Sequence, residues 1–342
     1  MVRGAANNFA LPANVSKANP SMINTKIAVV VVTYNGSVWI ADCLSSLRDH
    51  ECQVQAIVVD NASTDGTVII IERDFPEVHL IKLEHNVGFG VGNNVGIAWA
   101  IAWGADYVLL LNQDAYVLPG TLVEMGGFMD AHPAYGVCSP LHCSPDEHTL
   151  DLKTFRNYLR RYAQEYLCDA IMGRAKEHYT IHGVNAAVWF VRADTFACVG
   201  GFDPLFFMYG EDDDMLSRMA YHELKFALLT RVRVVHQRQS PPTNRAGLFA
   251  RLQRKTRRQS SHLLKEVKLP QNSATFMVSL LISRGLVRPL ADVILDRDVE
   301  AFAANLAAAG WVGTRFLHVW RNARRTSTGG AHFLATGKAR AD

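Results

Sequence analysis

The sequence predicts an α/β protein with a mostly parallel central sheet, flanked by helices and followed by a helical C-terminal extension. Three observations predict it. Short apolar runs recur between residues 26 and 112, with helix-forming segments between them. Polar residues follow these runs directly, as they do where strands end at a ligand-binding crevice. The chain has 342 residues and 49% hydrophobic content, enough to bury one large core.

Strands and helices alternate through the first half of the chain. The apolar runs predict strands at 26–35, 54–60, 78–83, 107–112 and 134–140. The segments between them predict helices at 38–47, shortly after the turn at 61–66, at 88–104 and at 119–132. Pro119 suits the start of the last of these helices. This alternation favours parallel strands joined by crossover helices.

The second half is less regular. Residues 150–180 are polar and aromatic, with helical spacing and little sheet character. A strand is expected at 186–192, and a turn-rich loop at 195–210. Acidic residues open a predicted helix at 211–224, where they suit the positive end of the helix dipole. Residues 225–237 predict a strand or a strand pair.

Composition divides the chain into three regions. Residues 1–24 lack the apolar core of a signal peptide and predict a loose N-terminal extension. Residues 25–240 form the predicted main domain, and 241–342 a basic helical region with 17 Lys and Arg against 6 Asp and Glu. Six cysteines without zinc-site spacing favour a reducing cytoplasm. No apolar stretch reaches the roughly 18 residues of a spanning helix.

The basic region leaves two hypotheses open. Residues 247–267 mix Leu and Phe with Arg and Lys at helical spacing. Such a helix can lie on an anionic membrane surface, which would make the protein peripheral on the inner face of the cell membrane. Alternatively, it packs its Leu stripe on the body of the protein. Nucleic acid is not an expected partner, because no recognition module is present. The oligomeric state stays open.

The first candidate site residues follow two strands. Thr33 and Asn35 end the first strand, and Asp60, Asn61 and Ser63 end the second. An Asx turn would explain Asp60 by itself. If the two strands are adjacent, however, these side chains can face one base and ribose, because a carboxylate accepts a hydrogen bond from a pyrimidine N–H.

A Gly-rich segment, HNVGFGVGNNVG at 85–96, precedes the helix at 88–104. A dinucleotide-binding fingerprint belongs in the first strand–helix turn, so its position argues against a nicotinamide or flavin enzyme. The segment is either a flexible helix start or a close backbone approach to a ligand. In the second case, Gly88 is a donor-binding candidate, with Asn86, Asn93 and Asn94 as hydrogen-bonding partners of the ligand.

The metal candidates follow the fourth strand and end the last one. Asn112, Gln113 and Asp114 follow the run at 107–112. Mg²⁺ typically takes one or two carboxylates together with phosphate oxygens, and Asp114 offers one. An Asp in an ordinary loop is the alternative. His236 ends a predicted strand, where it is either a buried structural histidine or a ligand.

The run EDDD at 211–214 supplies the candidate base. Crowded carboxylates raise one another's pKa, which suits a general base near neutral pH. Helix N-terminal stabilisation is the alternative. Glu211 and Asp214 would share one side of the helix, with Asp212 facing elsewhere. His182, Asn185 and Trp189 are acceptor-side candidates, with core packing as the alternative for Trp189.

The order of six motifs across residues 26–238 resembles family 2 glycosyltransferases, and most of all their bacterial rhamnosyltransferase-like branch. The motifs are TYN, VVDNASTDGT, NVGFGVGNN, LLLNQDAYV, GGFDPLFFMYGEDDDMLSR and VVH. The resemblance implies a GT-A fold, an inverting mechanism, a nucleotide-sugar donor and a Mg²⁺ or Mn²⁺ ion. It implies an acceptor that is a glycan or a lipid-linked glycan of the cell surface.

The resemblance also implies roles. Asp114 matches the last acid of the DxD metal motif, with Asn112 at the first position, and His236 matches a histidine that completes the metal shell. Asp212 matches the catalytic base, with Glu211 beside it. For the base and ribose the resemblance implies Thr33, Asn35 and Asp60. Together with the candidates from the residues themselves, the expected donor-binding residues are Thr33, Asn35, Asp60, Asn61, Ser63, Asn86, Gly88, Asn93, Asn112 and Gln113. The expected acceptor-side residues are His182, Asn185, Trp189 and Asp214.

The identity of the sugar donor stays open between two candidates. dTDP-L-rhamnose is the leading candidate by resemblance, and a UDP-galactofuranosyl or other UDP-hexosyl donor is the alternative. A non-catalytic nucleotide-sugar-binding protein is a further alternative, which the intact acid cluster disfavours.

Overall fold

The computed structural model describes residues 25–48, 50, 52–238, 248–269, 271–287, 289–290 and 299–334. Within them the strands form one nine-stranded sheet with the order β3-β2-β1-β4-β8-β6-β9-β5, and β7 pairs with β9. The strands are β1 Lys26–Thr33, β2 Gln53–Asp60, β3 His79–Lys82, β4 Tyr107–Asn112, β5 Ala115–Val117, β6 Tyr135–Cys143, β7 His178–Ile181, β8 Val188–Arg192 and β9 Lys225–His236.

The sheet is mostly parallel, as predicted. β1, β2, β3 and β4 pair in parallel. β8 runs antiparallel to both β4 and β6, so β6 and its parallel partner β9 point the same way as the first four strands. In the described part of the chain, only β5, β7 and β8 run in the opposite direction.

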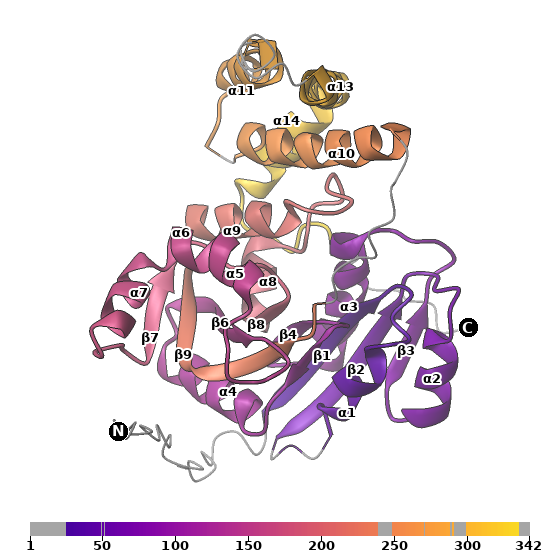
Figure 1. Cartoon of the computed structure of the whole chain (residues 1–342), viewed down its shortest axis with the longest axis vertical. Coiled ribbons are helices and arrows are strands. Elements are labelled where there is room, and N and C mark those ends of the chain that lie inside the picture. The colour runs from indigo at the N-terminus through magenta and orange to yellow at the C-terminus, as the bar shows by residue number, and fades with distance from the viewer. Residues whose placement is uncertain are drawn as a thin grey trace, which may run out of the picture.

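The helices of the main body alternate with the strands along the chain (Figure 1). They are α1 Ile40–Ser45, α2 Thr67–Asp74, α3 Phe89–Trp103, α4 Thr121–Ala131, α5 Leu152–Thr154, the π-helix η2 Phe155–Leu159, α6 Arg160–Tyr162, α7 Gln164–Ile171, α8 Ala193–Val199 and α9 Glu211–Tyr221. Helices α1, α2 and α4 pack on one face of the sheet. Helices α3, α8 and α9 pack on the other.

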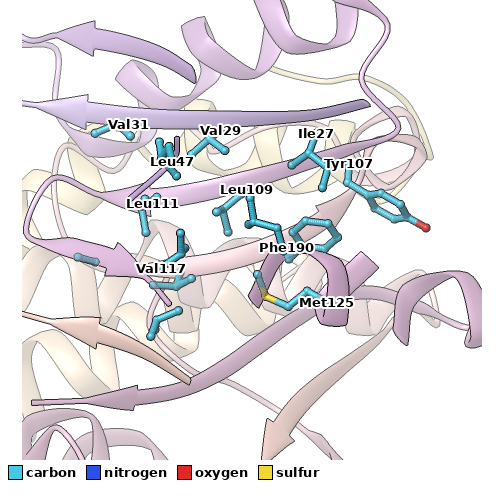
Figure 2. Packing of buried hydrophobic residues seen from close by; sticks show 14 of the residues in the cluster. Ile27, Val29, Val31, Leu47, Tyr107, Leu109, Leu111, Val117, Met125 and Phe190 are labelled. Carbon is cyan, nitrogen blue, oxygen red and sulfur yellow. The ribbon is translucent and has the colours of Figure 1, made fainter. Parts of the chain in front are cut away.

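Both faces of the central strands are buried, which explains their continuous apolar runs. Figure 2 shows Ile27, Val29 and Val31 of β1 on the face that also carries Leu109 and Leu111 of β4. Ala28 and Val30 point to the opposite face, toward α3. The backbone of α3 comes so close to β1 that a Cβ on Gly96 would lie 2.3 Å from Val30 Cγ1. Only glycine fits this approach without a shift of one element.

The structure corrects the predicted elements at three places. Residues 178–181 form β7, although little sheet character was expected there. Helix α8 begins at Ala193 and takes up the first part of the predicted loop at 195–210. The short strand β5 at Ala115–Val117 was not predicted. β5 and β7 form strands because each of them pairs with β9, which is distant in sequence.

The C-terminal region is helical, as predicted. Its described elements are α10 Leu248–Val267, α11 Ala274–Ile282, the π-helix η3 Ser283–Val287, α13 Val299–Thr314 and α14 Phe316–Thr326. Helix α10 lies against α9, and α11 and α13 lie beyond it (Figure 1). None of the described helices is both long and apolar enough to cross a membrane.

The structure favours the packing hypothesis for the C-terminal turns of α10. Leu263, Leu264 and Val267 are buried in a third apolar cluster with Phe206 of the main body. At these turns the apolar side chains therefore pack inside the protein, as the alternative hypothesis held. Gly247 and the side chains of 248–250 lie outside the described residues.

A buried charge network joins the C-terminal region to the main body. Lys268 Nζ lies 2.5 Å from Asp214 Oδ1 and 2.8 Å from Asp203 Oδ2, and all three side chains are at most 4% exposed. Asn322 of α14 donates to both oxygens of Asp203 at 2.9 and 3.0 Å. Arg218 of α9 completes the network with a 2.9 Å ion pair to Asp214. The tail thus supports the segment that leads into α9.

Candidate functional site

The carboxyl ends of three neighbouring strands carry the predicted donor-binding residues. Register pairs Thr33 of β1 with Asp60 of β2, and Val32 of β1 with Asn112 of β4. The side chains that were predicted separately therefore end side by side. This edge is where ligands collect in open α/β sheets.

Asp60 is the most informative residue of this edge. It is 2% exposed, and its Oδ2 accepts a hydrogen bond from Ser63 N at 3.0 Å. Its Oδ1 is buried without a hydrogen-bond partner. The Asx turn therefore explains one carboxylate oxygen and leaves the other unsatisfied. Buried polar atoms of native proteins are almost always paired, so an orphaned oxygen at a ligand edge indicates a missing donor group.

The loops around Asp60 are tied together by side chains. Asn35 N donates to Ser63 Oγ at 2.9 Å, and Asn35 Oδ1 accepts from Thr64 N at 2.8 Å. Gln113 Oε1 accepts from Thr33 Oγ1 at 2.5 Å and from Tyr34 N at 3.0 Å. Asn35 and Gln113 thus shape the loop after β1.

The Gly-rich segment is held by Asn61. Its Oδ1 accepts from Val87 N and its Nδ2 donates to Gly88 O, both at 3.2 Å. Asn86 Oδ1 accepts from Gly88 N at 2.9 Å. Gly88 has a φ of 89°, and a Cβ there would lie 2.2 Å from Phe207 O. Asn93 is 1% exposed and bonds to Phe89 O at 3.0 Å, so its amide serves the helix itself.

The predicted metal ligands lie in contact. His236 ends β9 opposite Ala115 of β5, which places its Nε2 3.2 Å from Asp114 Oδ1. Asp114 is 24% exposed and His236 only 2%. Burial acts to raise the pKa of Asp114, but the hydrogen bond and charge of His236 outweigh it and hold the pKa below its usual value. Asn112, two residues before Asp114 at the end of β4, is half-buried.

Sequence reasoning missed the residues behind His236. His142 of β6, Asp151 and His236 bring potential ligand atoms within 4.8 Å of one another. Arg238 Nε binds Asp151 Oδ2 at 2.6 Å. Burial lowers the pKa of His142 to about 3, so its ring is neutral. An Asp that starts a short helix was the only local signal, and nothing around His142 or Arg238 pointed to the site.

The acid cluster lies at the first turn of α9. Asp212 is half-buried, and burial followed by the charge of Asp213 raises its pKa to about 6. The backbone N–H of Ala186 donates to it. Burial and the charge of Asp212 raise the pKa of Glu211 to about 8, and Glu211 Oε2 has no hydrogen-bond partner. Lys265 of α10 binds Asp213 at 2.5 Å.

Contacts place the acid cluster at the same edge as the metal pair. Ala187, the neighbour of Ala186, accepts from Asn112 N at 2.8 Å. Burial raises the pKa of Tyr158, and the negative charges of Asp212 and Asp213 raise it further. The positive charge of Arg238 lowers the pKa of Tyr158. Tyr158 is thus within reach of the charges of both the acid cluster and Arg238, and the charge of Arg238 also acts on Asp114. The acids of three distant sequence segments thus gather around one group of strand ends.

Two acceptor-side predictions are corrected by burial. The Trp189 ring is fully buried, and its Nε1 donates to Val184 O at 3.2 Å, so it belongs to the core. Asp214 is 5% exposed and is engaged by Arg218 and Lys268, so its role is structural. His182 is exposed, and Asn185 is half-buried with an unpartnered Oδ1.

The family model of glycosyl transferase family 2 matches residues 28–199, half of the chain. The chain belongs to glycosyl transferase family 2. The match covers the strand ends at Thr33, Asp60 and Asn112, together with Asp114, and ends before Asp212 and His236.

Relatives agree with this family. The chain is 27% identical over 214 residues to N-acetylglucosaminyl-diphospho-decaprenol L-rhamnosyltransferase of Mycobacterium tuberculosis, which covers 56% of this chain and 70% of the relative. It is 31% identical over 109 residues to the dTDP-rhamnosyl transferase RfbF of Shigella flexneri, covering 32% of this chain and 36% of the relative.

Solved structures confirm the GT-A fold. The mannosyltransferase PcManGT of Pyrobaculum calidifontis, in complex with GDP-Man and Mn²⁺, superposes with a TM-score of 0.52 at 19% identity. The match covers 89% of this chain and 83% of that one. S. aureus TarS 1-349 with UDP-GlcNAc gives a TM-score of 0.50 at 17% identity, covering 88% and 91%.

Proposed function

We propose that this glycosyltransferase is an inverting enzyme of bacterial cell-surface polysaccharide synthesis. It transfers a sugar from a nucleotide-diphosphate donor to a hydroxyl of a glycan or lipid-linked glycan. One observation carries the proposal: the unpaired oxygen of Asp60, the Asp114–His236 pair and Asp212 gather at the same strand ends.

Asp60 binds the donor base in this proposal. Its unpartnered Oδ1 accepts a hydrogen bond from the N–H of a uracil or thymine ring. Asn35 and Ser63 hold the loops that frame the ring and ribose, together with Thr33 and Gln113. Asn61, Asn86 and Gly88 fix the loop before α3 close to the donor. A base without an N–H at that position would leave Asp60 unsatisfied.

Asp114 and His236 fit a divalent cation. Ligands at right angles around an ion, with bonds near 2.1 Å, lie about 3 Å apart. The distance of 3.2 Å between Asp114 Oδ1 and His236 Nε2 agrees with such a pair. An imidazole together with a carboxylate suits Mn²⁺ better than Mg²⁺, which prefers oxygen ligands only. When bound, the ion would stabilise the charge on the departing diphosphate.

Asp212 acts as the general base in this proposal. Its half-buried carboxylate, with a pKa of about 6, is mostly ionised at neutral pH and still basic enough to accept the acceptor's hydroxyl proton. The oxygen then attacks the anomeric carbon opposite the diphosphate. Glu211, with a pKa of about 8, is mostly protonated at neutral pH and can donate a hydrogen bond beside it.

The donor proposal rests on the two rhamnosyltransferases among the relatives. It names dTDP-L-rhamnose first, and a UDP-galactofuranose or other UDP-hexose donor second. The printed name of the mycobacterial relative favours a lipid-linked acceptor. His182 and Asn185 are the remaining acceptor-side candidates. Contact with an anionic membrane then falls to exposed basic side chains of α10 such as Arg257 and Arg258.

A thermal-shift screen tests the proposed function. The full-length protein is melted with dTDP-rhamnose, UDP-galactofuranose, UDP-glucose and GDP-mannose, each with Mn²⁺ or with EDTA. A dTDP- or UDP-sugar should raise the melting temperature more with Mn²⁺ than with EDTA. No shift with any of these donors would reject the proposal. Donor binding without transfer to any acceptor in a broad panel would favour the non-catalytic alternative.

A further inference from the structure

The ring of His236 lies between two carboxylates. Its Nε2 is 3.2 Å from Asp114 Oδ1, and its Nδ1 is 3.6 Å from Asp151 Oδ2. Nδ1 is buried and makes no hydrogen bond. An imidazole that binds a metal through one nitrogen usually donates its other N–H to a carboxylate or carbonyl, which fixes the ring. Asp151 offers an acceptor at the right nitrogen.

Asp151 is itself held in place. Its Oδ1 accepts from Lys153 N at 2.9 Å at the start of α5. Its Oδ2 accepts from Thr154 Oγ1 at 2.9 Å and from Arg238 Nε at 2.6 Å. The residue is 6% exposed. The carboxylate therefore has a fixed position next to the His236 ring and little freedom to turn away.

The separation of 3.6 Å is slightly longer than a hydrogen bond. Leaving a buried N–H unpaired is unfavourable, so a small rotation of the His236 ring toward Asp151 is expected when Nδ1 carries the proton. That tautomer leaves Nε2 without a proton and free to bind an ion together with Asp114.

The cluster of His142, Asp151 and His236 has the chemistry of a second ion site, but its surroundings oppose one. Arg238 is permanently charged, and its Nε at 2.6 Å already neutralises Asp151. A dication would meet that charge at close range. His142 faces the hydroxyl oxygens of Ser139 and Thr154 at 3.3 and 3.5 Å. The cluster is better suited to support His236.

We propose that Asp151 is a positioning residue that accepts the Nδ1–H of His236 and so directs Nε2 to the ion bound by Asp114. Arg238 and Thr154 hold Asp151 in this role. The inference rests on the proposed metal-dependent function. It extends the site by a residue 37 positions beyond Asp114, from a loop that contributes no ligand of its own.

The test measures Mn²⁺ binding, not turnover. The full-length protein is titrated with Mn²⁺ in the presence of dTDP, and free Mn²⁺ is followed by electron paramagnetic resonance. Asp151→Asn should weaken Mn²⁺ binding about 10- to 100-fold, the usual effect of losing such a support. Asp146→Asn is the matched control. Asp146 lies in the same loop, is exposed, and bonds only to His148 and Thr149 in the described contacts.

Thr154→Ala provides a second variant in case Asp151→Asn fails to fold. It removes one hydrogen bond to Asp151 and keeps the carboxylate, so Mn²⁺ binding should weaken in the same direction by less. Melting of each variant in EDTA identifies any that are unfolded.

Three results would overturn the inference. If folded Asp151→Asn and Thr154→Ala proteins bind Mn²⁺ as tightly as the wild type, then Asp151 does not position His236. That result would leave the metal-dependent function itself in place. A folded Asp114→Asn protein that keeps Mn²⁺ while Asp151→Asn loses it would place the ion in the His142 cluster. A wild-type protein that binds no Mn²⁺ with dTDP would refute the metal-dependent function itself.

Discussion

Lys268 joins the C-terminal region to the acid helix through a buried ion network, and its removal should destabilise the fold strongly. Lys268→Met keeps most of the side-chain volume, so the cavity contribution is small. Its charge currently balances Asp203 and Asp214 together with Arg218, with distances of 2.8, 2.5 and 2.9 Å. Without Lys268, the three remaining charged groups are Asp203, Asp214 and Arg218, and one negative charge in the interior is uncompensated.

The size of the effect follows from this burial. Breaking a buried ion pair by removing one partner typically costs about 3–5 kcal/mol. That is a large fraction of a total stability of about 5–15 kcal/mol. We therefore expect the urea midpoint of Lys268→Met to fall sharply at pH 7.

Lys265→Met is the matched control, one helical turn earlier on α10. Lys265 pairs with Asp213 at 2.5 Å, but the two side chains are 22% and 32% exposed. A pair this open should contribute only about 0–1 kcal/mol. Equal midpoint shifts for the two variants would refute the assignment of a buried network at Lys268.

The pH dependence provides an independent check. Burial acts to raise the pKa of Asp214, but Lys268 and Arg218 outweigh it and hold the pKa below its usual value. A carboxyl with a lowered folded pKa stabilises the fold above its unfolded pKa, near 3.9, and loses this contribution as the pH falls through the folded value. The difference between wild type and Lys268→Met should therefore shrink as the pH falls below about 4, toward the folded pKa of Asp214.

Other changes test the site itself. Asp60→Asn should weaken donor binding about tenfold or more in isothermal titration, because an amide nitrogen facing the base N–H cannot accept its hydrogen bond; unchanged affinity would contradict base binding. Asp114→Asn should reduce the Mn²⁺-dependent part of the donor-induced thermal shift, and a full shift would contradict metal ligation. The transfer rate should rise with pH through about 6 and then level, because Asp212 must be ionised to act as base; a rate that falls over that range would contradict this. Glu211→Gln should raise stability at pH 8, because a carboxyl whose folded pKa is raised to about 8 costs stability as the pH rises above its unfolded value. The gain in stability of Glu211→Gln should vanish below about pH 4.5. If Glu211→Gln is no more stable than the wild type at pH 8, then ionisation of Glu211 costs the fold nothing.

Local sequence pattern was sufficient for the central sheet. Before their last residues, Thr33, Asp60 and Asn112, these three strands are apolar at every position that the sheet buries, so the strand type was visible. The ends at Asp60 and Asn112 were also predicted, while the first strand ends at Thr33, two residues before the predicted end. The polar residues directly after them gave the donor edge. Element boundaries shifted by a few residues, since fraying and capping decide helix ends.

The rest depends on contacts between distant segments. β7 is a strand because Tyr179 and Ile181 pack inward while it pairs with β9. Asp151 reaches His236 only through the pairing of β6 with β9, and no spacing in the chain encodes that approach. The charges of residues 247–267 suggested a surface helix, yet Lys268, directly after α10, neutralises buried carboxylates of the main body.

The most direct test of the central claim is the transfer activity of Asp212→Asn, measured together with its donor affinity. Donor and Mn²⁺ should bind as in the wild type, while transfer to an acceptor found in the panel should fall about 10²–10⁴-fold. Asp213→Asn is the control, because Asp213 is engaged by Lys265 and not assigned to the chemistry. An Asp212→Asn enzyme that binds donor and still transfers sugar at nearly the wild-type rate would contradict the proposed mechanism.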